Sequence, residues 1–523
     1  MVAAFACLLV GGCVASGPRV SVPAGAAVPA PGLPPARAQR GLTILHTNDT
    51  HGRLLPFDYP APADTGSVLA KLPAIRDVGG IARRATLARS IREQAGARGQ
   101  RVWLVDAGDF CDGTPFSTEY HGEADMAAMN AAGYDYGILG NHEFNGTIAH
   151  LEKLVSLSDH PILCGNAWID ATARPVAVPM LIREIGPVKV GLIGLVTHEA
   201  ASYPAAREGI TVEDEVAHAR RLVAELRPLV DVVVLFTHVG EEVDERIARE
   251  VPGVDVIVGG HSHTRLPQGV LVASSRQERG PSSSCDPGGT IVAQAFQWGG
   301  ELGRLDLAFC DRPRPGIDRY EAKLLPVTSA LPEDPAVREI VERYWKPIER
   351  KFDEPIAVAT ADFTQRGPDL APYNLVADAE RETFGTDVAL ENLGGVRAPL
   401  TEGTITYGDL TMVDPFDNRM VLFEASGAQL REILLRAEPA VSGLRYRIDH
   451  GKLLEATVGG EPLDDARRYT VVTHDYFAST FLAGMPLEIR PTERRRLQVI
   501  ADYLRQKQTV SPVYDGRRIV TRD

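Results

Sequence analysis

The chain has 523 residues, of which 44% are hydrophobic and 24% charged, and it is too long for one average domain. Its net charge of −14 argues against nucleic-acid binding through a basic surface, so we expect no nucleic-acid partner. An anionic substrate would not be attracted by the overall field. A phosphate site would therefore need local positive charge from metal ions or a few arginines.

The N-terminus suggests export. Residues 3–12 are apolar and small but too few to span a bilayer, and a lipobox-like cleavage site precedes Cys13. We expect residues 1–13 to be a lipoprotein-type signal and Cys13 to carry a lipid anchor, giving an exported periplasmic or cell-surface lipoprotein. Residues 1–4 lack Lys and Arg, so either the true start lies upstream or the segment is not a signal. Residues 14–40, rich in Pro and Ala, are typical of a tether.

From residue 41, short apolar runs alternate with helical stretches. The patterns predict strands at 42–45, 101–105, 136–139, 188–196, 230–236 and 254–258, two more within 289–309, and helices near 80–98, 122–132 and 147–156. Long Val/Ile/Leu runs indicate strands buried on both faces, so helices should cover the sheets. In an exported protein Cys285 and Cys310 could form a disulfide; the alternative is two free thiols.

A charged helical stretch at 332–351 divides the chain. After it the patterns predict helices near 374–384 and 427–436 and strands at 387–390, 452–457 and 469–473. We therefore expect an α/β chain with one domain at 41–325, a linker helix within 326–355 and a second α/β domain at 356–523.

Five polar loops follow apolar runs in the first domain. Since loops after strands are the usual place for a site in an α/β sheet, five such loops are hard to explain as turns alone. Mixed imidazole, carboxylate and amide groups suit Zn, Mn, Fe or Co, and there are enough for two divalent ions. The loops contain Asp49 with His51, Asp109, Asn141 with His142, His238, and His261 with His263.

The ordered set Asp-x-His, Gly-Asp, Gly-Asn-His-Glu, His and Gly-His-x-His resembles the calcineurin-like metallophosphoesterases. The strings at 45–52 and 140–144 look like the 5′-nucleotidase branch of that superfamily. The resemblance implies a four-layer α-β-β-α sandwich followed by a C-terminal substrate-binding domain. In the family that second domain rotates to deliver substrate, so the linker helix would act as a hinge.

The resemblance also implies roles. One ion would be held by Asp49, His51 and His263, and the other by Asn141, His238 and His261, with Asp109 bridging them. A metal-bound hydroxide would then attack phosphorus in line with the leaving oxygen. His142 would stabilise charge on the phosphoryl oxygens or on the leaving group, assisted by Asn145.

The C-terminal domain should bind a nucleotide. The segment 392–397 resembles the family's substrate loop, in which Asn392 would hydrogen-bond the substrate and Arg397 would bind phosphate or ribose oxygens. Phe416 and Tyr476 would sandwich the base. Phe477 is the alternative to Tyr476, because neighbours on a strand point opposite ways. Arg366 is a further phosphate candidate.

Two departures from the family limit the choice of substrate. Ser479–Leu482 replaces a Gly-Gly-Asp-Gly turn, and Asn145 stands where many 5′-nucleotidases have Asp. The leading hypothesis is hydrolysis of nucleotide phosphomonoesters. The alternatives are a 2′,3′-cyclic-nucleotide phosphodiesterase, a nucleotide-sugar diphosphatase and a degenerate ligand-binding lipoprotein without activity.

Overall fold

The structure is a computed structural model that describes residues 41–59, 76–273, 287–310 and 315–521, apart from 367–368, 399 and 417. The expected signal, the Cys13 anchor, the tether and Cys285 lie outside these ranges. Cys310 is disulfide-bonded, whereas Cys111 and Cys164 are free. Within the described ranges no helix combines the length and apolar character needed to cross a membrane.

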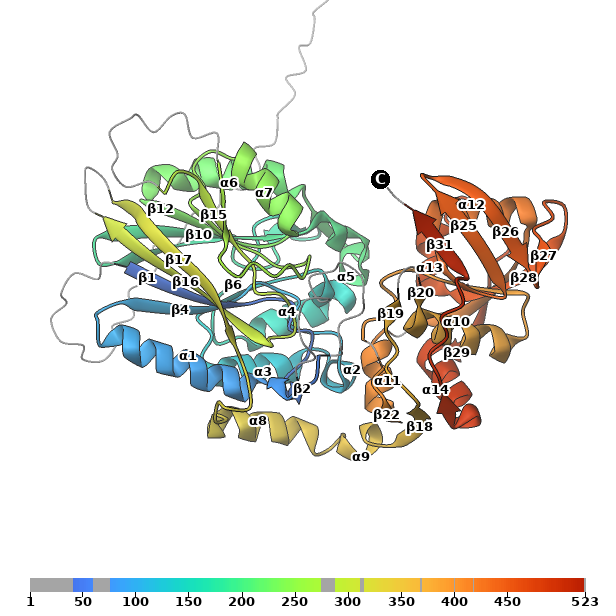
Figure 1. The fold of residues 1–523 in the computed structure, drawn as a ribbon. Coiled ribbons are helices and arrows are strands. Elements are labelled where there is room, and N and C mark those ends of the chain that lie inside the picture. Colours follow the sequence, from blue (N-terminus) through green and yellow to red (C-terminus); the bar gives the residue numbers. More distant parts are fainter. Residues whose placement is uncertain are drawn as a thin grey trace, which may run out of the picture.

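Two six-stranded sheets form the centre of the first domain (Figure 1). The first runs in the order β17 (Gly316–Pro326), β16 (Glu301–Cys310), β1 (Gly41–Thr47), β4 (Arg101–Asp106), β5 (Tyr136–Ile138), β6 (Ile162–Leu163). The second runs in the order β14 (Val270–Val272), β15 (Thr290–Ala293), β13 (Val256–Val258), β12 (Val232–His238), β10 (Val188–Val196), β9 (Met180–Ile185).

Each sheet is buried on both faces. Side chains such as Ile44 and Phe236 fill the core between the sheets. The outer face of the first sheet packs on α1 (Ile81–Gly96), α3 (Glu123–Ala132) and α4 (Ile148–Leu157), and that of the second on α6 (Glu215–Leu226) and α7 (Glu241–Glu250). The four-layer α-β-β-α prediction is therefore confirmed (Figure 1). Helices α6 and α7 are additions to the helices that the sequence patterns predicted.

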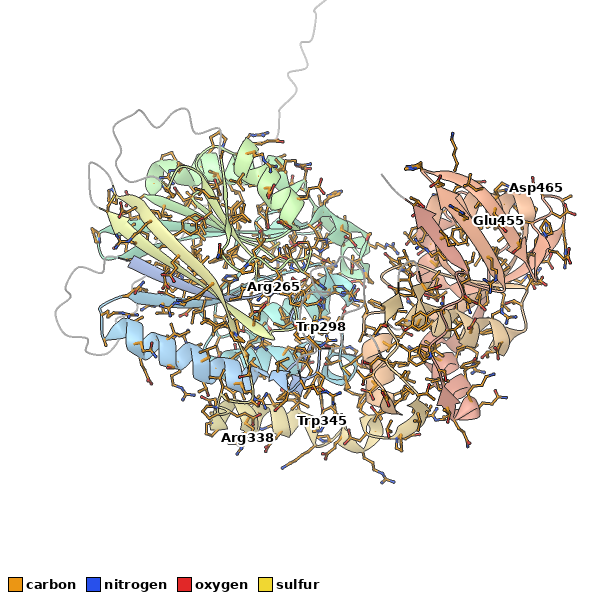
Figure 2. The ribbon with its side chains drawn as sticks, in the orientation of Figure 1. Arg265, Trp298, Arg338, Trp345, Glu455 and Asp465 are labelled. Carbon is orange, nitrogen blue, oxygen red and sulfur yellow. The ribbon has the colours of Figure 1, made fainter. Side chains whose placement is uncertain are left out.

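The stretch expected to form one linker helix contains two. Helix α8 (Pro335–Trp345) ends just before Pro347, and α9 (Glu349–Phe352) follows it. Proline lacks a backbone N–H and disfavours helix at the preceding residue, which explains the break. The Trp345 ring of α8 lies 5.4 Å from that of Phe116, so α8 packs on the first domain (Figure 2).

The C-terminal region forms a separate α/β unit (Figure 1). Its five-stranded sheet has the order β24 (Ala440–Ser442), β21 (Val388–Glu391), β28 (Arg468–His474), β23 (Arg419–Ser426), β29 (Arg490–Arg495). A four-stranded sheet contains β27 (Glu461–Pro462), β26 (Lys452–Val458), β25 (Leu444–Asp449) and β31 (Arg518–Thr521), and a three-stranded one contains β22 (Gly403–Thr406), β18 (Pro355–Ala359) and β30 (Thr509–Val510). The helices include α10 (Ala371–Phe384), α11 (Tyr407–Val413), α12 (Gly427–Ala437), α13 (Asp475–Phe481) and α14 (Arg496–Lys507).

Parallel pairing brings the polar loops to one edge of the sandwich. In the first sheet Thr47 of β1 lies opposite Asp106 of β4, and in the second Val196 of β10 lies opposite His238 of β12. Strand β13 continues this parallel order beside β12. The loops that follow these strands therefore leave at the carboxyl ends of their sheets, where side chains from different loops can meet.

Candidate metal centre

Three overlapping groups of potential metal ligands lie at this edge. Within each group one ligand atom per residue lies within 4.8 Å of the others. The groups are Asp49 with His51 and His263, Asp109 with His238 and His261, and His51 with Asp109 and His142. Asn141 joins the second group, since its Oδ1 is 3.0 Å from His261 Nδ1. The structure thus brings together all seven residues that the sequence suggested as metal ligands.

The two carboxylates are central in this cluster. Asp49 Oδ1 is 3.2 Å from His263 Nε2 and 3.8 Å from His238 Nε2. Asp109 Oδ2 is 3.0 Å from His238 Nε2 and 3.8 Å from His51 Nε2. Asp109 therefore faces a histidine of each triplet, which is the placement that a bridging ligand requires.

Backbone carbonyls orient two of the imidazoles. His51 Nδ1 lies 2.9 Å from the Asp112 carbonyl oxygen, and His238 Nδ1 lies 2.7 Å from that of Ala107. Because these carbonyls accept the Nδ1 proton, each Nε2 lone pair faces the carboxylates. The Nε2 atoms of His51 and His263 are 3.3 Å apart. Lone pairs and carboxylates converging in this way fit a divalent cation.

The backbone is strained at the same residues. Asp49, His51, Asp109, His261 and His263 all have φ between 48° and 79°, a region that non-glycine residues rarely adopt. Such strain concentrates at functional sites. Gly140 is also required here, because a Cβ at that position would lie 2.1 Å from Asp109 Oδ1.

Buried charges in the cluster depend on one another. Burial alone would raise the pKa of Asp109, but His238 and His142 outweigh it and hold this pKa well below its ordinary value. Burial, together with the charge of Asp109, raises the pKa of Glu143 to about 7. Glu143 accepts backbone N–H groups of Gly140 and Asp109 at 2.6 and 3.1 Å, so it fixes the loop.

His142 lies beside the cluster, 7% exposed. Its Nε2 is 3.9 Å from Asp109 Oδ2, and its Nδ1 is 3.1 Å from Asn145 Nδ2. A residue that the sequence did not suggest, Asp112, places Oδ2 3.5 Å from the same Nδ1. Burial lowers the pKa of His142, but Asp109 and the hydrogen bond to Asp112 raise it more, so the net shift is upward.

Known proteins share both the domains and this arrangement of elements. Residues 42–265 match the family model of the calcineurin-like phosphoesterases, and residues 355–481 match that of the 5′-nucleotidase C-terminal domain. The 5′-nucleotidase of Bos taurus is 31% identical over 75% of this chain and 72% of its own length. The chain belongs to the 5′-nucleotidase family.

Alignments with other members of the family cover most of this chain and most of the relative. The 5′-nucleotidase of Vibrio cholerae is 29% identical over 82% of this chain and 83% of its own. The crystal structure of a 5′-nucleotidase precursor from Thermus thermophilus superposes with a TM-score of 0.79, at 27% identity, over 92% of this chain and all of that one. Family membership makes this protein a phosphoric ester hydrolase.

The C-terminal domain of this family member contributes two side chains to the cluster. Arg397 Nη2 lies 3.4 Å from His51 Nε2. The ring of Phe416, which follows α11, stacks on that of His142 with centroids 6.2 Å apart and planes at 22°. Asn392 is 7% exposed, and its side-chain oxygen has no hydrogen-bond partner among the described residues.

The remaining substrate candidates differ in position. Tyr476 and Phe477 were expected on a strand, but they lie in the first turn of α13, because His474 caps that helix by accepting the Phe477 N–H. Phe477 is fully buried in the core of the second domain, whereas Tyr476 is 42% exposed. Arg366 lies on the short strand β19 (Gln365–Arg366), and its side chain is outside the described part of the structure.

Two further residues reach the cluster from the loop after β10. Glu199 Oε2 is 3.4 Å from His261 Nε2, and Asn141 Nδ2 donates to the Tyr203 hydroxyl at 2.7 Å. Strand β10 is parallel to β12, so the loop after it leaves at the same edge as the other polar loops. The position of Glu199 and Tyr203 shortly after the predicted strand at 188–196 is the sequence signal that points to them.

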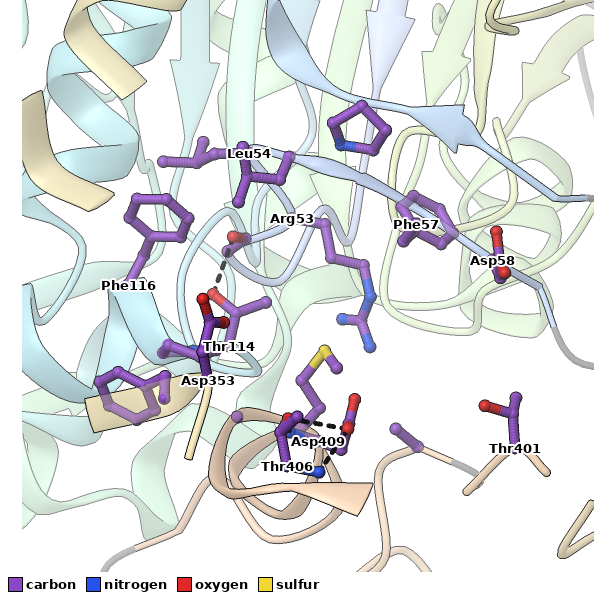
Figure 3. Close-up of a pocket in the computed structure, with 18 of the residues that line it drawn as sticks. Arg53, Leu54, Phe57, Asp58, Thr114, Phe116, Asp353, Thr401, Thr406 and Asp409 are labelled. Atoms are coloured by element: carbon purple, nitrogen blue, oxygen red, sulfur yellow. Dashed lines mark hydrogen bonds between the residues drawn. The ribbon is translucent and has the colours of Figure 1, made fainter. Parts of the chain in front are cut away.

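A cavity of about 370 Å³ lies between the domains, next to the loop that carries His51 (Figure 3). Arg53 points into it, with its guanidinium 3.6 Å from the centre of the Trp298 ring. Asp409 faces it from the C-terminal domain, where it takes part in a capping box with Thr406. The charged side chains in its lining are Arg53, Asp58, Asp353 and Asp409.

Proposed function

We propose that this protein hydrolyses nucleotide phosphomonoesters with the help of two divalent ions. The observation that supports this most is the meeting of two domains at one point. The first domain supplies a cluster of carboxylates and imidazoles, and the second supplies Arg397 and Phe416 to the same place. A phosphoryl group with an aromatic substituent needs both kinds of partner.

The distances within the cluster support the ligand sets that the family resemblance implies. Asp49, His51 and His263 would hold one ion, Asn141, His238 and His261 the other, and Asp109 would contact both. When bound, the ions would neutralise phosphoryl charge and make water acidic enough to act as hydroxide at neutral pH. Imidazole with carboxylate ligands suits Zn, Mn, Co or Fe.

The side chains around the cluster would bind and orient the substrate. Arg397 would bind phosphoryl oxygens with its forked donors, and Asn392 would offer its buried amide oxygen to a hydroxyl of the substrate. Phe416 and Tyr476 would hold the base. His142 would direct Nε2 at the developing charge on the phosphoryl group or on the leaving oxygen.

Initial rates with AMP and with 2′,3′-cyclic AMP test this proposal. We expect inorganic phosphate release from AMP to dominate at equal concentrations, with about two ions per chain by elemental analysis. A preference for ring opening of the cyclic substrate would replace the proposal by the phosphodiesterase alternative. Fewer than two ions, together with no phosphate from any nucleotide, would favour a ligand-binding lipoprotein.

We also propose export and anchoring through Cys13, on the strength of the apolar run and the lipobox-like sequence. Expression of the full chain in a bacterium should place it in the membrane fraction, with a diacylglyceryl mass on the peptide that begins at Cys13. The Cys13→Ser variant should move to the soluble exported fraction. Equal partitioning of both proteins would contradict the anchor.

A further inference from the structure

Asp112 contacts two histidines of the site by two different groups. Its backbone carbonyl accepts from His51 Nδ1 at 2.9 Å, and its carboxylate lies 3.5 Å from His142 Nδ1. Asn145 lies beside both Asp112 and His142: its Nδ2 donates to Asp112 Oδ2 and is 3.1 Å from His142 Nδ1. The Asp112 carboxylate therefore accepts from the Asn145 amide and also faces His142 Nδ1, for which it is the acceptor when this nitrogen carries a proton.

The backbone of Asp112 has the same unusual conformation as several of the ligand candidates. Its φ of 64° places it in the left-handed region, as it does for five of the seven ligand candidates. The side chain is 21% exposed, so its charge is only partly screened by water. Among the described residues, His142 is the ion-pair partner of this carboxylate.

We propose that Asp112 is the positioning carboxylate of His142 in this protein, and that Asn145 holds this carboxylate in place by donating to it. Asp112 fixes the ring from the Nδ1 side, so that Nε2 faces Asp109 and the reacting phosphoryl group. Asp112 is not a metal ligand, since it belongs to none of the three ligand groups among the described residues. The inference rests on the proposed function, because His142 must act on a bound phosphoester.

The test exchanges the two polar groups. Asp112→Asn removes the charge while keeping the shape, and asparagine tolerates the left-handed backbone. We expect kcat to fall about 10- to 100-fold, with KM changing less than about threefold and metal content unchanged. Asn145→Asp alone should also lower kcat, because two carboxylates would then face each other without a donor between them.

The double variant Asp112→Asn/Asn145→Asp restores one carboxylate and one amide in reversed order. The new carboxylate would then stand where the amide of Asn145 now lies, 3.1 Å from His142 Nδ1. We expect kcat to recover to within about fivefold of the parent, above both single variants. Asp318→Asn, an exposed carboxylate on β17, is the matched control for losing one negative charge and should behave as the parent.

Three results would overturn the inference. Asp112→Asn could be as active as Asp318→Asn, or it could lose metal. The double variant could also have a kcat no higher than the product of the two single effects predicts. Failure of the proposed function would be seen separately, as a parent enzyme that releases no phosphate from nucleotides. The same comparisons are then made with p-nitrophenyl phosphate, for which the expected order of the variants is unchanged.

Discussion

Replacing Arg496 by methionine should destabilise the C-terminal domain and weaken substrate binding together. Arg496 begins α14 and is fully buried. Its guanidinium donates to Glu391 at 2.6 Å, to Asp414 at 2.7 Å and to Glu380 at 3.1 Å. It also donates to the carbonyl of Gly395, in the loop that carries Asn392 and Arg397. One side chain thus joins the segments that carry the proposed substrate residues.

The magnitude follows from what methionine would leave behind. Removing one partner of a buried ion pair costs about 3–5 kcal/mol, because the remaining charge stays buried without compensation. Burial raises the pKa of Glu391, yet Arg496 and His474 hold it at about 2. Glu391 is therefore ionised and loses a strong electrostatic partner when Arg496 is replaced. In the variant Glu391 can take up a proton, and this limits the loss of stability. The destabilisation should therefore be larger at pH 8 than at pH 5.

Calorimetry can follow the C-terminal transition separately from that of the first domain. We expect its midpoint to fall while the transition of the first domain and the metal content stay unchanged, and KM to rise in the folded variant. Adding Glu391→Gln to Arg496→Met should recover at least about 1 kcal/mol, since it removes the stranded charge. A loss below about 1 kcal/mol at pH 8, or an unchanged KM, would refute the reasoning.

Three other predictions can be checked on the same protein. Removing metal with a chelator should lower the free energy of unfolding of the first domain by about 4 kcal/mol per ion present at a thousandfold excess over its Kd, and its unfolding midpoint should fall accordingly; an unchanged midpoint would argue against ions in the cluster. Arg397→Lys should lower kcat/KM for AMP about 10- to 100-fold, because a charged hydrogen bond contributes about 1.5–3 kcal/mol and lysine lacks the fork, and equal values would place the phosphate elsewhere. Burial lowers the pKa of His160 to about 4 from 6.5, so folded His160 resists protonation and the free energy of unfolding should fall as the pH drops through that window, by up to about 3 kcal/mol. His160→Phe should flatten that part of the stability profile, and an unaltered slope between pH 6.5 and 4 would contradict the assignment.

Prediction from the sequence was most accurate for strands and loops that a single local pattern specifies. The unbroken apolar run at 188–196 coincides with β10, and the polar residues after β1, β4, β12 and β13 do meet at one edge. The expected linker helix is divided at Pro347, because the charged periodicity on both sides of the proline indicates helix while the proline itself interrupts it. Tyr476 was misplaced because a helix cap by His474 depends on the fold around β28.

Asp112 could not have been found from local pattern. An aspartate followed by glycine is an ordinary turn signal, and the carboxylate gains its meaning from His142, which comes much later in the chain. Asp109 and His142 were both suggested by the sequence, but the bond from the His142 backbone N–H to Asp109 Oδ1 at 2.9 Å also required the fold. Residue types predicted the chemistry of this site, whereas partners within it required the fold.

The division of the site between two domains explains which residues should control catalysis and which should control specificity. The cluster is fixed inside the first domain by carbonyl contacts, strained backbone and a required glycine, so its geometry does not depend on the second domain. Arg397 and Phe416, by contrast, meet His51 and His142 only through side chains that cross between domains. If the second domain binds the substrate as proposed, contacts such as that of Lys351 of α9 with Glu119 of the first domain would affect where the substrate lies. Weakening such a contact should change KM more than metal affinity, because the proposed metal ligands all belong to the first domain.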